Sequence, residues 1–205
     1  MIDLGGGTTD LAIFLDGSIR HSAVLPIGGQ NLTKDLAIGL LTSQTEAEKI
    51  KLQHGIARTG LVQGHEMVEV PSVGDRPARR CLRRDLAEIL EPRVEEIFEL
   101  VRREIARAGY EGMVGAGVVI TGGTSLLEGM PDAAEQVLYL PARRGAPGGL
   151  GGLRDIVSNP IHATGVGLLL HARRHLEEMA IAGLRSGRPL DKVLTRMRGW
   201  FFELF

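Results

Sequence analysis

The stretch Asp3-Leu4-Gly5-Gly6-Gly7-Thr8-Thr9-Asp10 decides the fold of this chain. It lies between two short apolar runs, residues 1–4 and 10–15, which predict a strand on each side of a glycine turn. Asp16-Gly17 is a hairpin signal, and residues 19–27 form a third strand-like run. The chain therefore opens directly in a β-sheet. Because no segment leads into that sheet, we expect the chain to be a fragment of a longer protein.

The glycine stretch has the composition of a phosphate-binding loop. Consecutive glycines allow several backbone N–H groups to point at one spot, and threonine hydroxyls beside them suit phosphate oxygens. The candidate residues are Gly5, Gly6, Gly7, Thr8 and Thr9. Asp3, at the end of the first strand, is placed to hold a metal-bound water. The alternative is an ordinary glycine hairpin, but the two threonines and two flanking aspartates favour phosphate binding.

A second glycine loop follows a later strand. Residues 118–121 are an apolar run that leads into Gly122, Gly123 and Thr124. Two glycines after a buried strand let a flat ring approach the backbone. Taken alone, this pattern fits a strand-to-helix turn better. Two such loops, each after a strand and more than a hundred residues apart, favour one shared nucleotide site.

The rest of the chain alternates predicted helices and strands. Apolar spacing, capping residues and turn signals predict the following elements: helices at residues 31–41 (capped by Asn31), 46–54 (capped by Thr45), 83–108, 131–137 and 161–174, and strands at residues 66–71, 78–82 and 138–140. Pro92 should kink or break the long helix. Residues 143–152 are predicted to be a glycine-rich loop. Glu48 and Lys51 lie one helical turn apart, and the spacing alone indicates a solvated surface pair.

Composition excludes several classes of protein. The chain has 205 residues, 43% of them hydrophobic, with a net charge of −1, so we expect no nucleic-acid partner. No apolar run approaches the roughly 20 residues of a spanning helix, and we expect no signal peptide. Cys81 is the single cysteine, which excludes an internal disulfide and fits a reducing cytosol. The arginines beside Cys81 would lower its pKa, but no paired histidine supports a catalytic thiol.

The last fifteen residues predict a membrane-binding helix. Four of the eight aromatic residues lie in the last six positions. On a helical wheel the apolar side comprises Val193, Met197, Trp200, Phe201, Leu204 and Phe205. A short amphipathic helix with aromatic and basic residues, preceded by a linker at residues 183–190, is typical of an interfacial anchor. The alternative is a tail that docks on protein.

These motifs resemble those of the actin, Hsp70 and sugar-kinase superfamily. The first glycine stretch is similar to its second phosphate motif, and residues 118–124 are similar to its adenosine motif. Glu48-Lys49-Ile50-Lys51 resembles the helix through which bacterial actins contact ribose and adenine. Within the superfamily the chain most resembles the C-terminal half of the FtsA family of cell-division proteins. The segments that carry this resemblance are residues 20–29, 70–79, 86–93 and 159–169 and the run Gly199-Trp200-Phe201.

The resemblance implies an α/β fold: domain II of an actin-like ATPase (ribonuclease H-like), with an inserted α+β subdomain and a C-terminal amphipathic helix. Residues 1–29 and 111–182 would form the discontinuous subdomain IIA. Residues 30–110 would form subdomain IIB on the nucleotide side. Residues 191–205 would be the membrane-targeting helix after the linker.

The resemblance also implies a function. Such a protein would bind ATP and Mg, tether the FtsZ ring to the cytoplasmic face of the inner membrane at the division septum, self-associate into actin-like polymers and recruit other divisome proteins. The FtsZ C-terminal tail would dock on residues 30–110, with Arg76 and Arg79 at or near that surface. Asp3 would lie near the metal, Gly5 to Thr8 would hold phosphates, and Gly122, Gly123 and Thr124 would flank the adenosine, with Glu48 and Lys51 on the ribose and adenine.

The resemblance covers only half of the nucleotide cleft, because the first phosphate motif is absent. We therefore expect this chain alone to bind ATP poorly and not to hydrolyse it. In the Hsp70 chaperones of this superfamily, an arginine at the position of Leu126 stacks on the adenine. The leucine here speaks against an Hsp70. Three alternatives stay open: a pilus-assembly actin homologue, one half of a sugar or acetate kinase, and a truncated gene product.

Overall fold

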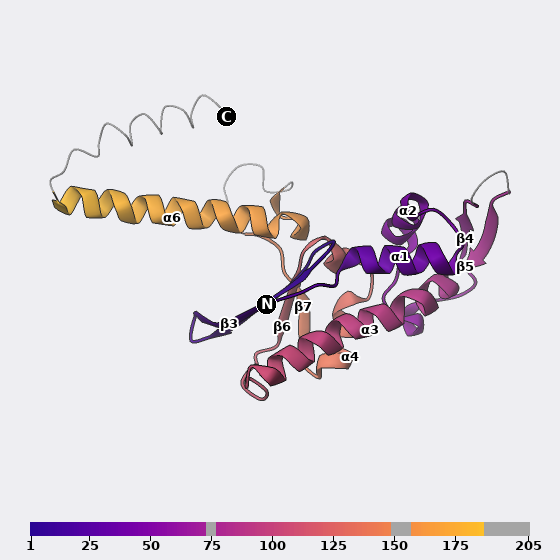
Figure 1. The fold of residues 1–205 in the computed structure, drawn as a ribbon, viewed down its shortest axis with the longest axis horizontal. Helices are drawn as coiled ribbons and strands as arrows, with labels where there is room; N and C mark the ends of the chain where they lie inside the picture. Colours follow the sequence, from indigo (N-terminus) through magenta and orange to yellow (C-terminus); the bar gives the residue numbers. More distant parts are fainter. Residues whose placement is uncertain (73–76, 149–156, 187–205) are drawn as a thin grey trace, which may run out of the picture. The chain divides into compact units, whose positions relative to one another are not determined.

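The computed structural model describes residues 1–72, 77–148 and 157–186 (Figure 1). The chain forms two compact units, Met1–Ala163 and Thr164–Phe205. The first unit contains the sheet and its covering helices. The second contains most of the long helix α6 (Ala163–Ser186).

The main sheet has five strands in the order β3-β2-β1-β6-β7. Its members are β1 (Ile2–Leu4), β2 (Thr9–Leu15), β3 (Ser18–Leu25), β6 (Val118–Thr121) and β7 (Ala142–Arg144). The three predicted N-terminal strands are confirmed as an antiparallel meander, and Asp16 and Gly17 take the positive φ angles of 52° and 75° that its tight turn needs. β1 and β6 are parallel neighbours. Both strands therefore end at the same edge of the sheet, and each is followed by a glycine loop.

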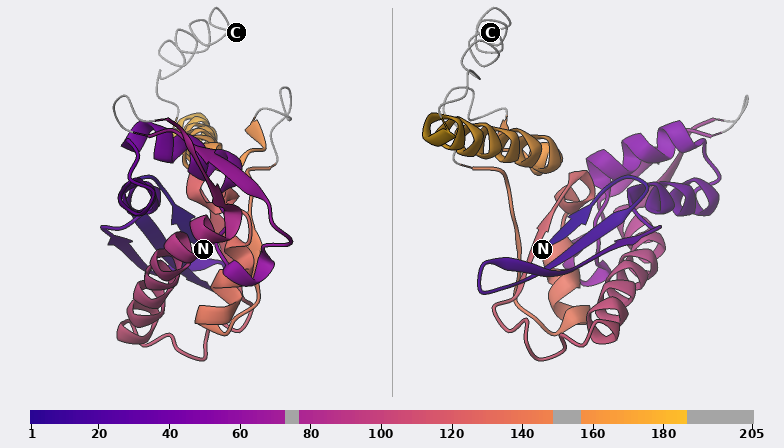
Figure 2. Two further views of the ribbon diagram at one scale, coloured as in Figure 1. Left: turned by 90° about the vertical axis from the view of Figure 1, so that its right-hand side faces the viewer. Right: turned by 60° about the vertical axis from the view of Figure 1, so that its left-hand side comes forward.

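Three helices and a hairpin lie between β3 and β6 in the chain. They are α1 (Gly29–Gly39), α2 (Gln44–His54), the hairpin of β4 (Met67–Val70) and β5 (Arg79–Leu82), and α3 (Arg83–Arg107). α3 runs from the hairpin along α1 to the neighbourhood of β3 and α4 (Met130–Leu138), as Figures 1 and 2 show. Short 3₁₀ turns lie at Thr59–Leu61, Gly123–Leu126 and Pro160–His162.

The core of the first unit joins the sheet to α1 and α3. Residues at helical spacing on α3 are fully buried, among them Leu90, Val94 and Phe98, and they share one cluster with Leu4 of β1 and Leu36 of α1. Of the kink or break expected at Pro92, the break is wrong, because α3 continues across it. Pro92 lies on the exposed side of the helix. The apolar face continues on both sides of it, and its burial outweighs the one backbone hydrogen bond that proline removes.

Several predicted boundaries differ from the structure. The N-cap of α1 is Gly28, and Asn31 accepts a hydrogen bond from the Gly28 backbone N–H at 3.1 Å. The N-cap of α2 is Ser43 instead of Thr45, because the Ser43 hydroxyl accepts from the Glu46 N–H at 3.2 Å. The predicted strand at residues 138–140 is wrong: Leu138 ends α4, and the chain turns through Tyr139 at a φ of 56°. The strand is β7 instead, which includes part of the predicted glycine-rich loop.

The last helix is longer than predicted. Asn159 caps the turn Pro160–His162 by accepting from the Ile161 N–H at 3.1 Å, and α6 then continues to Ser186. The first four residues of the predicted linker are therefore helical. The remainder of the linker and the predicted membrane-binding residues from Val193 to Phe205 lie outside the described residues. Among the residues that the structure describes, no helix is both long and apolar enough to span a membrane.

Candidate functional site

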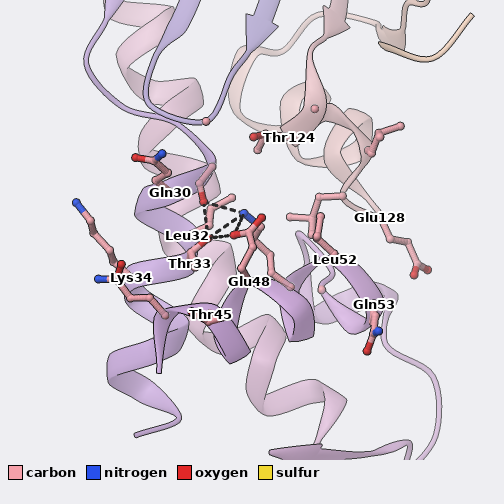
Figure 3. Close-up of a pocket in the computed structure, with 18 of the residues that line it drawn as sticks. Gln30, Leu32, Thr33, Lys34, Thr45, Glu48, Leu52, Gln53, Thr124 and Glu128 are labelled. Carbon is pink, nitrogen blue, oxygen red and sulfur yellow. Dashed lines mark hydrogen bonds and ion pairs between the residues drawn. The ribbon is translucent and has the colours of Figure 1, made fainter. Parts of the chain in front are cut away.

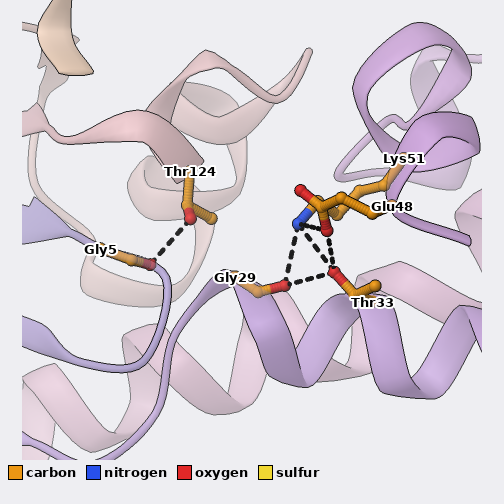
Figure 4. A network of polar contacts seen from close by, with 6 residues as sticks. All are labelled: Gly5, Gly29, Thr33, Glu48, Lys51 and Thr124. Carbon is orange, nitrogen blue, oxygen red and sulfur yellow. Dashed lines mark hydrogen bonds and ion pairs between the residues drawn. The ribbon is translucent and has the colours of Figure 1, made fainter. Parts of the chain in front are cut away.

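The two glycine loops meet at the edge of the sheet. The Thr124 hydroxyl donates a hydrogen bond to the Gly5 carbonyl oxygen at 2.9 Å (Figure 4). The start of α1 closes on the same loop, since the backbone N–H of Gly29 donates to Gly5 O at 3.0 Å and that of Gln30 to Gly6 O at 2.7 Å. The two glycine loops are therefore in contact, as predicted, and the start of α1 contacts the first of them as well.

Close backbone approach explains two glycines outside the triple-glycine run. A Cβ on Gly28 would lie 2.7 Å from the Gly6 carbonyl oxygen. Gly122 has a φ of +84°, and a Cβ there would lie 2.2 Å from Asp3 Oδ1. A side chain at Gly28 would therefore displace the first glycine loop, and one at Gly122 would displace the end of β1.

A cavity of about 860 Å³ opens beside this junction (Figure 3). One wall consists of α1 and α2, and the other is the second glycine loop and its continuation to Glu128. Apolar side chains at its surface include Leu52, Leu126 and Ile161, all exposed. This size and mixture of polar and apolar lining are typical of small-molecule sites.

Lys51 forms the polar centre of the α1–α2 wall. Its ammonium group donates to Glu48 Oε2 at 2.8 Å, Thr33 Oγ1 at 2.9 Å and the Gly29 carbonyl at 3.0 Å (Figure 4). Lys51 is only 8% exposed, whereas the Glu48 side chain is 43% exposed. The simple interpretation of this pair as a solvated surface pair is therefore wrong. Lys51 is a buried anchor that fixes the Glu48 carboxylate at the cavity surface.

The Glu48 carboxylate is held in its ionised form. Partial burial alone would raise its pKa, but hydrogen bonds from Lys51 and Thr33 and the positive charge of Lys51 outweigh burial and lower the pKa. Thr33 also donates to Glu48 Oε2. The remaining carboxylate surface faces the cavity as a fixed hydrogen-bond acceptor, which suits a ligand that carries hydroxyl or amine donors.

The predicted site residues divide into three groups. Gly6, Glu48, Lys51, Gly123 and Thr124 line the cavity. Asp3, Gly5, Gly7, Thr8 and Gly122 lie on the same strand ends and loops without lining it. Thr9 is a correction: it is completely buried in β2, and its hydroxyl donates to the Ile27 carbonyl at 2.8 Å, so it is not available to a ligand.

Sequence reasoning missed three cavity residues with clear structural roles. Thr33 orients Glu48 and Lys51 from α1, and Arg83 and Glu128 join the walls at the far end. Thr33 lies one turn after Gly29, and its hydroxyl oxygen is 3.0 Å from the Gly29 carbonyl oxygen. No short sequence motif signals these contacts, because each joins segments well separated along the chain.

The other predicted residues stand apart from the cavity. Arg79 donates to the Leu40 carbonyl at the end of α1, and Arg76 lies outside the described residues. The expected lowering of the Cys81 pKa is wrong: burial and the nearby Asp85 carboxylate raise it, and Arg79 offsets only part of this effect. In the described part of the chain no three His, Cys, Asp or Glu side chains are grouped to hold a metal ion.

Comparison with known proteins identifies the family. The sequence profile described as cell division protein FtsA matches residues 1–167. The chain belongs to the FtsA family. This result selects the cell-division family over the pilus-assembly and kinase alternatives.

Two curated FtsA relatives match nearly the whole chain. The cell division protein FtsA of Pseudomonas aeruginosa is 45% identical over 98% of this chain and 49% of its own length. That of Neisseria meningitidis is 44% identical over 100% of this chain and 50% of its own length. The chain thus spans about half the length of these FtsA relatives.

A solved structure confirms the actin-like fold. MreB5 of Spiroplasma citri, crystallised with ADP, superposes with a TM-score of 0.64 over 87% of this chain and 54% of its own chain, at 19% identity.

Proposed function

We propose that this chain is the nucleotide-binding C-terminal half of a cell-division scaffold, and that ATP binds in the cavity between α2 and the second glycine loop. The observation that carries the proposal is the Glu48–Lys51–Thr33 network facing Thr124 across one cavity, in a chain of the FtsA family. MreB5, which shares the fold, was crystallised with ADP.

The residues present fit a nucleotide. The ionised Glu48 carboxylate would accept hydrogen bonds from the ribose hydroxyls, with Lys51 holding it in place. The exposed apolar side chains of Leu126 and Ile161 offer a surface for the base. The phosphates would extend toward Gly6 and the rest of the first glycine loop, whose backbone N–H groups suit anionic oxygens.

Magnesium would be held with the help of the phosphates. Asp3 is a partly exposed residue of β1, two positions before the first glycine loop. Mg²⁺ commonly keeps several waters and uses one or two carboxylates together with substrate phosphates. A single carboxylate at Asp3 fits that mode of binding, through a bound water.

A titration with fluorescent ATP tests the nucleotide site. We expect weak binding by this chain, and we expect Glu48→Gln to weaken it roughly tenfold, because a charged acceptor is lost. Glu46→Gln is the matched control, since Glu46 lies on the same helix and pairs with the exposed Lys49. Equal affinity of Glu48→Gln and wild type would contradict the site. Micromolar binding by wild type would contradict the view that half the cleft is missing.

The scaffold role has two further parts. The chain would tether FtsZ, because the C-terminal tail of FtsZ would dock on residues 30–110 near Arg76 and Arg79. The chain would reach the inner membrane through its own residues 191–205. Self-association into polymers and contacts with other divisome proteins would complete this role. Support for this proposal comes from membership of the FtsA family and from the amphipathic sequence of the last fifteen residues.

Flotation with anionic vesicles tests the membrane part. We expect the complete chain to float and a version ending at Gly187 to remain at the bottom of the gradient. If neither floats, the tail docks on protein and the tethering proposal is wrong.

A further inference from the structure

Arg83 joins the two walls of the cavity. Its Nε donates to the His54 carbonyl at 2.9 Å, its Nη1 to Glu66 at 3.2 Å, and its Nη2 to Glu128. The Arg83 side chain is 17% exposed. All three guanidinium nitrogens are thus engaged by acceptors of the protein itself.

The partners of Arg83 come from both walls. His54 is the last residue of α2, so its carbonyl has no partner within the helix, and a cation there also complements the helix dipole. Glu128 follows the turn of the second glycine loop. Lys51, which anchors Glu48, lies one turn before His54. Arg83 therefore contacts α2 next to the residues that we assign to the nucleotide.

The backbone seam between the walls is short. The Ala57 N–H donates to the Glu128 carbonyl at 2.8 Å, and Ile56 forms an isolated parallel bridge with Glu128. A Cβ on Gly55 would lie 2.6 Å from Leu127 Cδ1, so the walls are in contact here. The Arg83 side chain adds charged contacts to this seam, beside the Ala57–Glu128 backbone hydrogen bond and the apolar contact.

The guanidinium group is suited to this task. Burial alone would lower the Arg83 pKa, but hydrogen bonds and charges from Glu128 and Glu66 raise it above its ordinary value, so the group stays charged. A planar guanidinium presents five donors in a fixed fork. The three donors of a lysine all lie on one nitrogen, whereas the partners of Arg83 are contacted by three different nitrogens of the guanidinium group.

We propose that Arg83 is a positioning residue for nucleotide binding, which holds α2, with Glu48 and Lys51, in register with the second glycine loop. The inference rests on the proposed function of the cavity. Arg83 acts through the His54 carbonyl and Glu128, and its own nitrogens are already occupied by these partners and by Glu66.

The test compares Arg83→Lys with Arg84→Lys in the complete chain. Arg84 is the adjacent arginine, and it makes an exposed pair with Glu88 on the same helix. Amide hydrogen exchange at residues 51–57 and 123–128 is measured without nucleotide, and ATP affinity is measured by titration. We expect Arg83→Lys to exchange roughly tenfold faster at both segments and to bind ATP roughly tenfold more weakly. A loss of about 1.4 kcal/mol in the free energy of local opening corresponds to a tenfold change in the opening equilibrium. Arg84→Lys should match wild type in both.

Glu128 supplies a second pair of variants. Because the Glu128 side chain is 58% exposed, its replacement should leave the fold intact. We expect Glu128→Ala to reproduce the Arg83→Lys effects in direction, and Glu128→Gln, which keeps an acceptor, to restore much of the ATP affinity. If Glu128→Ala acted through a general loss of stability, we would not expect Glu128→Gln to restore the ATP affinity.

The outcomes separate the inference from the proposed function. Wild-type exchange rates and wild-type ATP affinity in both Arg83→Lys and Glu128→Ala would overturn the positioning role. Faster exchange with unchanged ATP affinity would also overturn it, because the clamp would then be structural only. If wild type itself shows no ATP binding, the proposed nucleotide function is wrong and the role of Arg83 in it is wrong too, while exchange still reports whether Arg83 joins the walls.

Discussion

The Thr124 hydroxyl donates a hydrogen bond to the Gly5 carbonyl across 119 residues of sequence. This bond joins the loops that follow two adjacent parallel strands, β1 and β6. The same Gly5 oxygen accepts from the Gly29 N–H, so the start of α1 is fixed at the junction as well. The cavity thus depends on a three-way contact, and its residues can be tested one element at a time.

Replacement of Thr124 by valine removes the bond without changing the shape of the side chain. Because Gly5 O keeps its hydrogen bond from Gly29, we expect a loss of about 1 kcal/mol in the free energy of unfolding. The free energy of ATP binding should weaken by a similar amount. Thr124→Ser retains the hydroxyl and should recover most of both quantities in denaturant unfolding and ATP titration. Equal loss in the two variants would show that the hydroxyl is not what joins the loops.

Replacement of Lys51 by methionine tests the buried anchor. Three acceptors lose their donor, but Glu48 is partly exposed and water can solvate it, so we expect the free energy of unfolding to fall by about 1–3 kcal/mol. Lys49→Met is the control on the same helix, where the lysine side chain is 59% exposed, and it should cost less than about 0.5 kcal/mol. Urea unfolding of both variants distinguishes these values. A Lys51→Met protein as stable as Lys49→Met would contradict the burial of the ammonium group.

A methyl group at Gly28 should disturb the first glycine loop. The Gly28 backbone is extended, with a φ of −169°, so alanine is not strained there by its conformation. Its Cβ would instead collide with the carbonyl oxygens of Gly6 at 2.7 Å and Gly5 at 2.8 Å. We expect Gly28→Ala to reduce stability by about 1–3 kcal/mol, as overpacking does, and to weaken ATP binding.

Gly60→Ala provides the comparison for Gly28→Ala. No atom lies within 4 Å of a Cβ at Gly60, so this variant should remain within about 0.5 kcal/mol of wild type. The measurement is denaturant unfolding of the two proteins side by side. Similar stabilities would mean that the loop accommodates a side chain at Gly28.

The buried carboxylate of Glu104 should make stability sensitive to acid. Hydrogen bonds from Arg107 and His21 outweigh burial and lower its pKa from 4.5 to about 2. Since the folded-state pKa lies below the unfolded one, the stabilisation is complete above pH 4.5 and is lost as the pH falls toward 2. We expect the stability difference between wild type and Glu104→Gln to be about 1–3 kcal/mol at neutral pH and to shrink through that window.

Glu99→Gln is the control for the acid experiment. Glu99 pairs with Arg102 on the same helix, but both side chains are substantially exposed, so the effect should stay below about 1 kcal/mol at every pH. Thermal unfolding from pH 7 to pH 2 provides the curves. A wild-type advantage over Glu104→Gln that does not change with pH would contradict the low pKa.

Local sequence signals predicted the parts of the fold that depend on neighbours in the chain. The strands β1, β2, β3 and β6 follow from apolar runs bounded by glycine and Asp16-Gly17 turns. The caps at Gly28 and Ser43 were missed, because several residues near a helix start can cap it and packing selects one. β7 was misplaced because three residues carry little periodicity, and its pairing with β6 decides its position.

The site residues in the glycine loops can be predicted from the sequence. Those that depend on tertiary contacts between distant segments cannot. The glycine loops have a sequence signature, but the burial of Lys51 depends on Thr33 and Gly29, which lie 18 and 22 residues before it. Thr9 was wrongly assigned because alternation along β2 turns its side chain into the core. The contact of Arg83 with Glu128 spans 45 residues and leaves no local pattern.

An ATP titration followed by nuclear magnetic resonance on the ¹⁵N-labelled chain reports which residues contact the nucleotide. We expect ATP, raised into the millimolar range, to shift a set of backbone signals together, with one common affinity: those of Gly6, Gly29, Glu48, Lys51, Gly123 and Thr124. No shift at these residues, or a set of shifted residues away from the cavity, would contradict the claim that the two glycine loops and α2 form one nucleotide site.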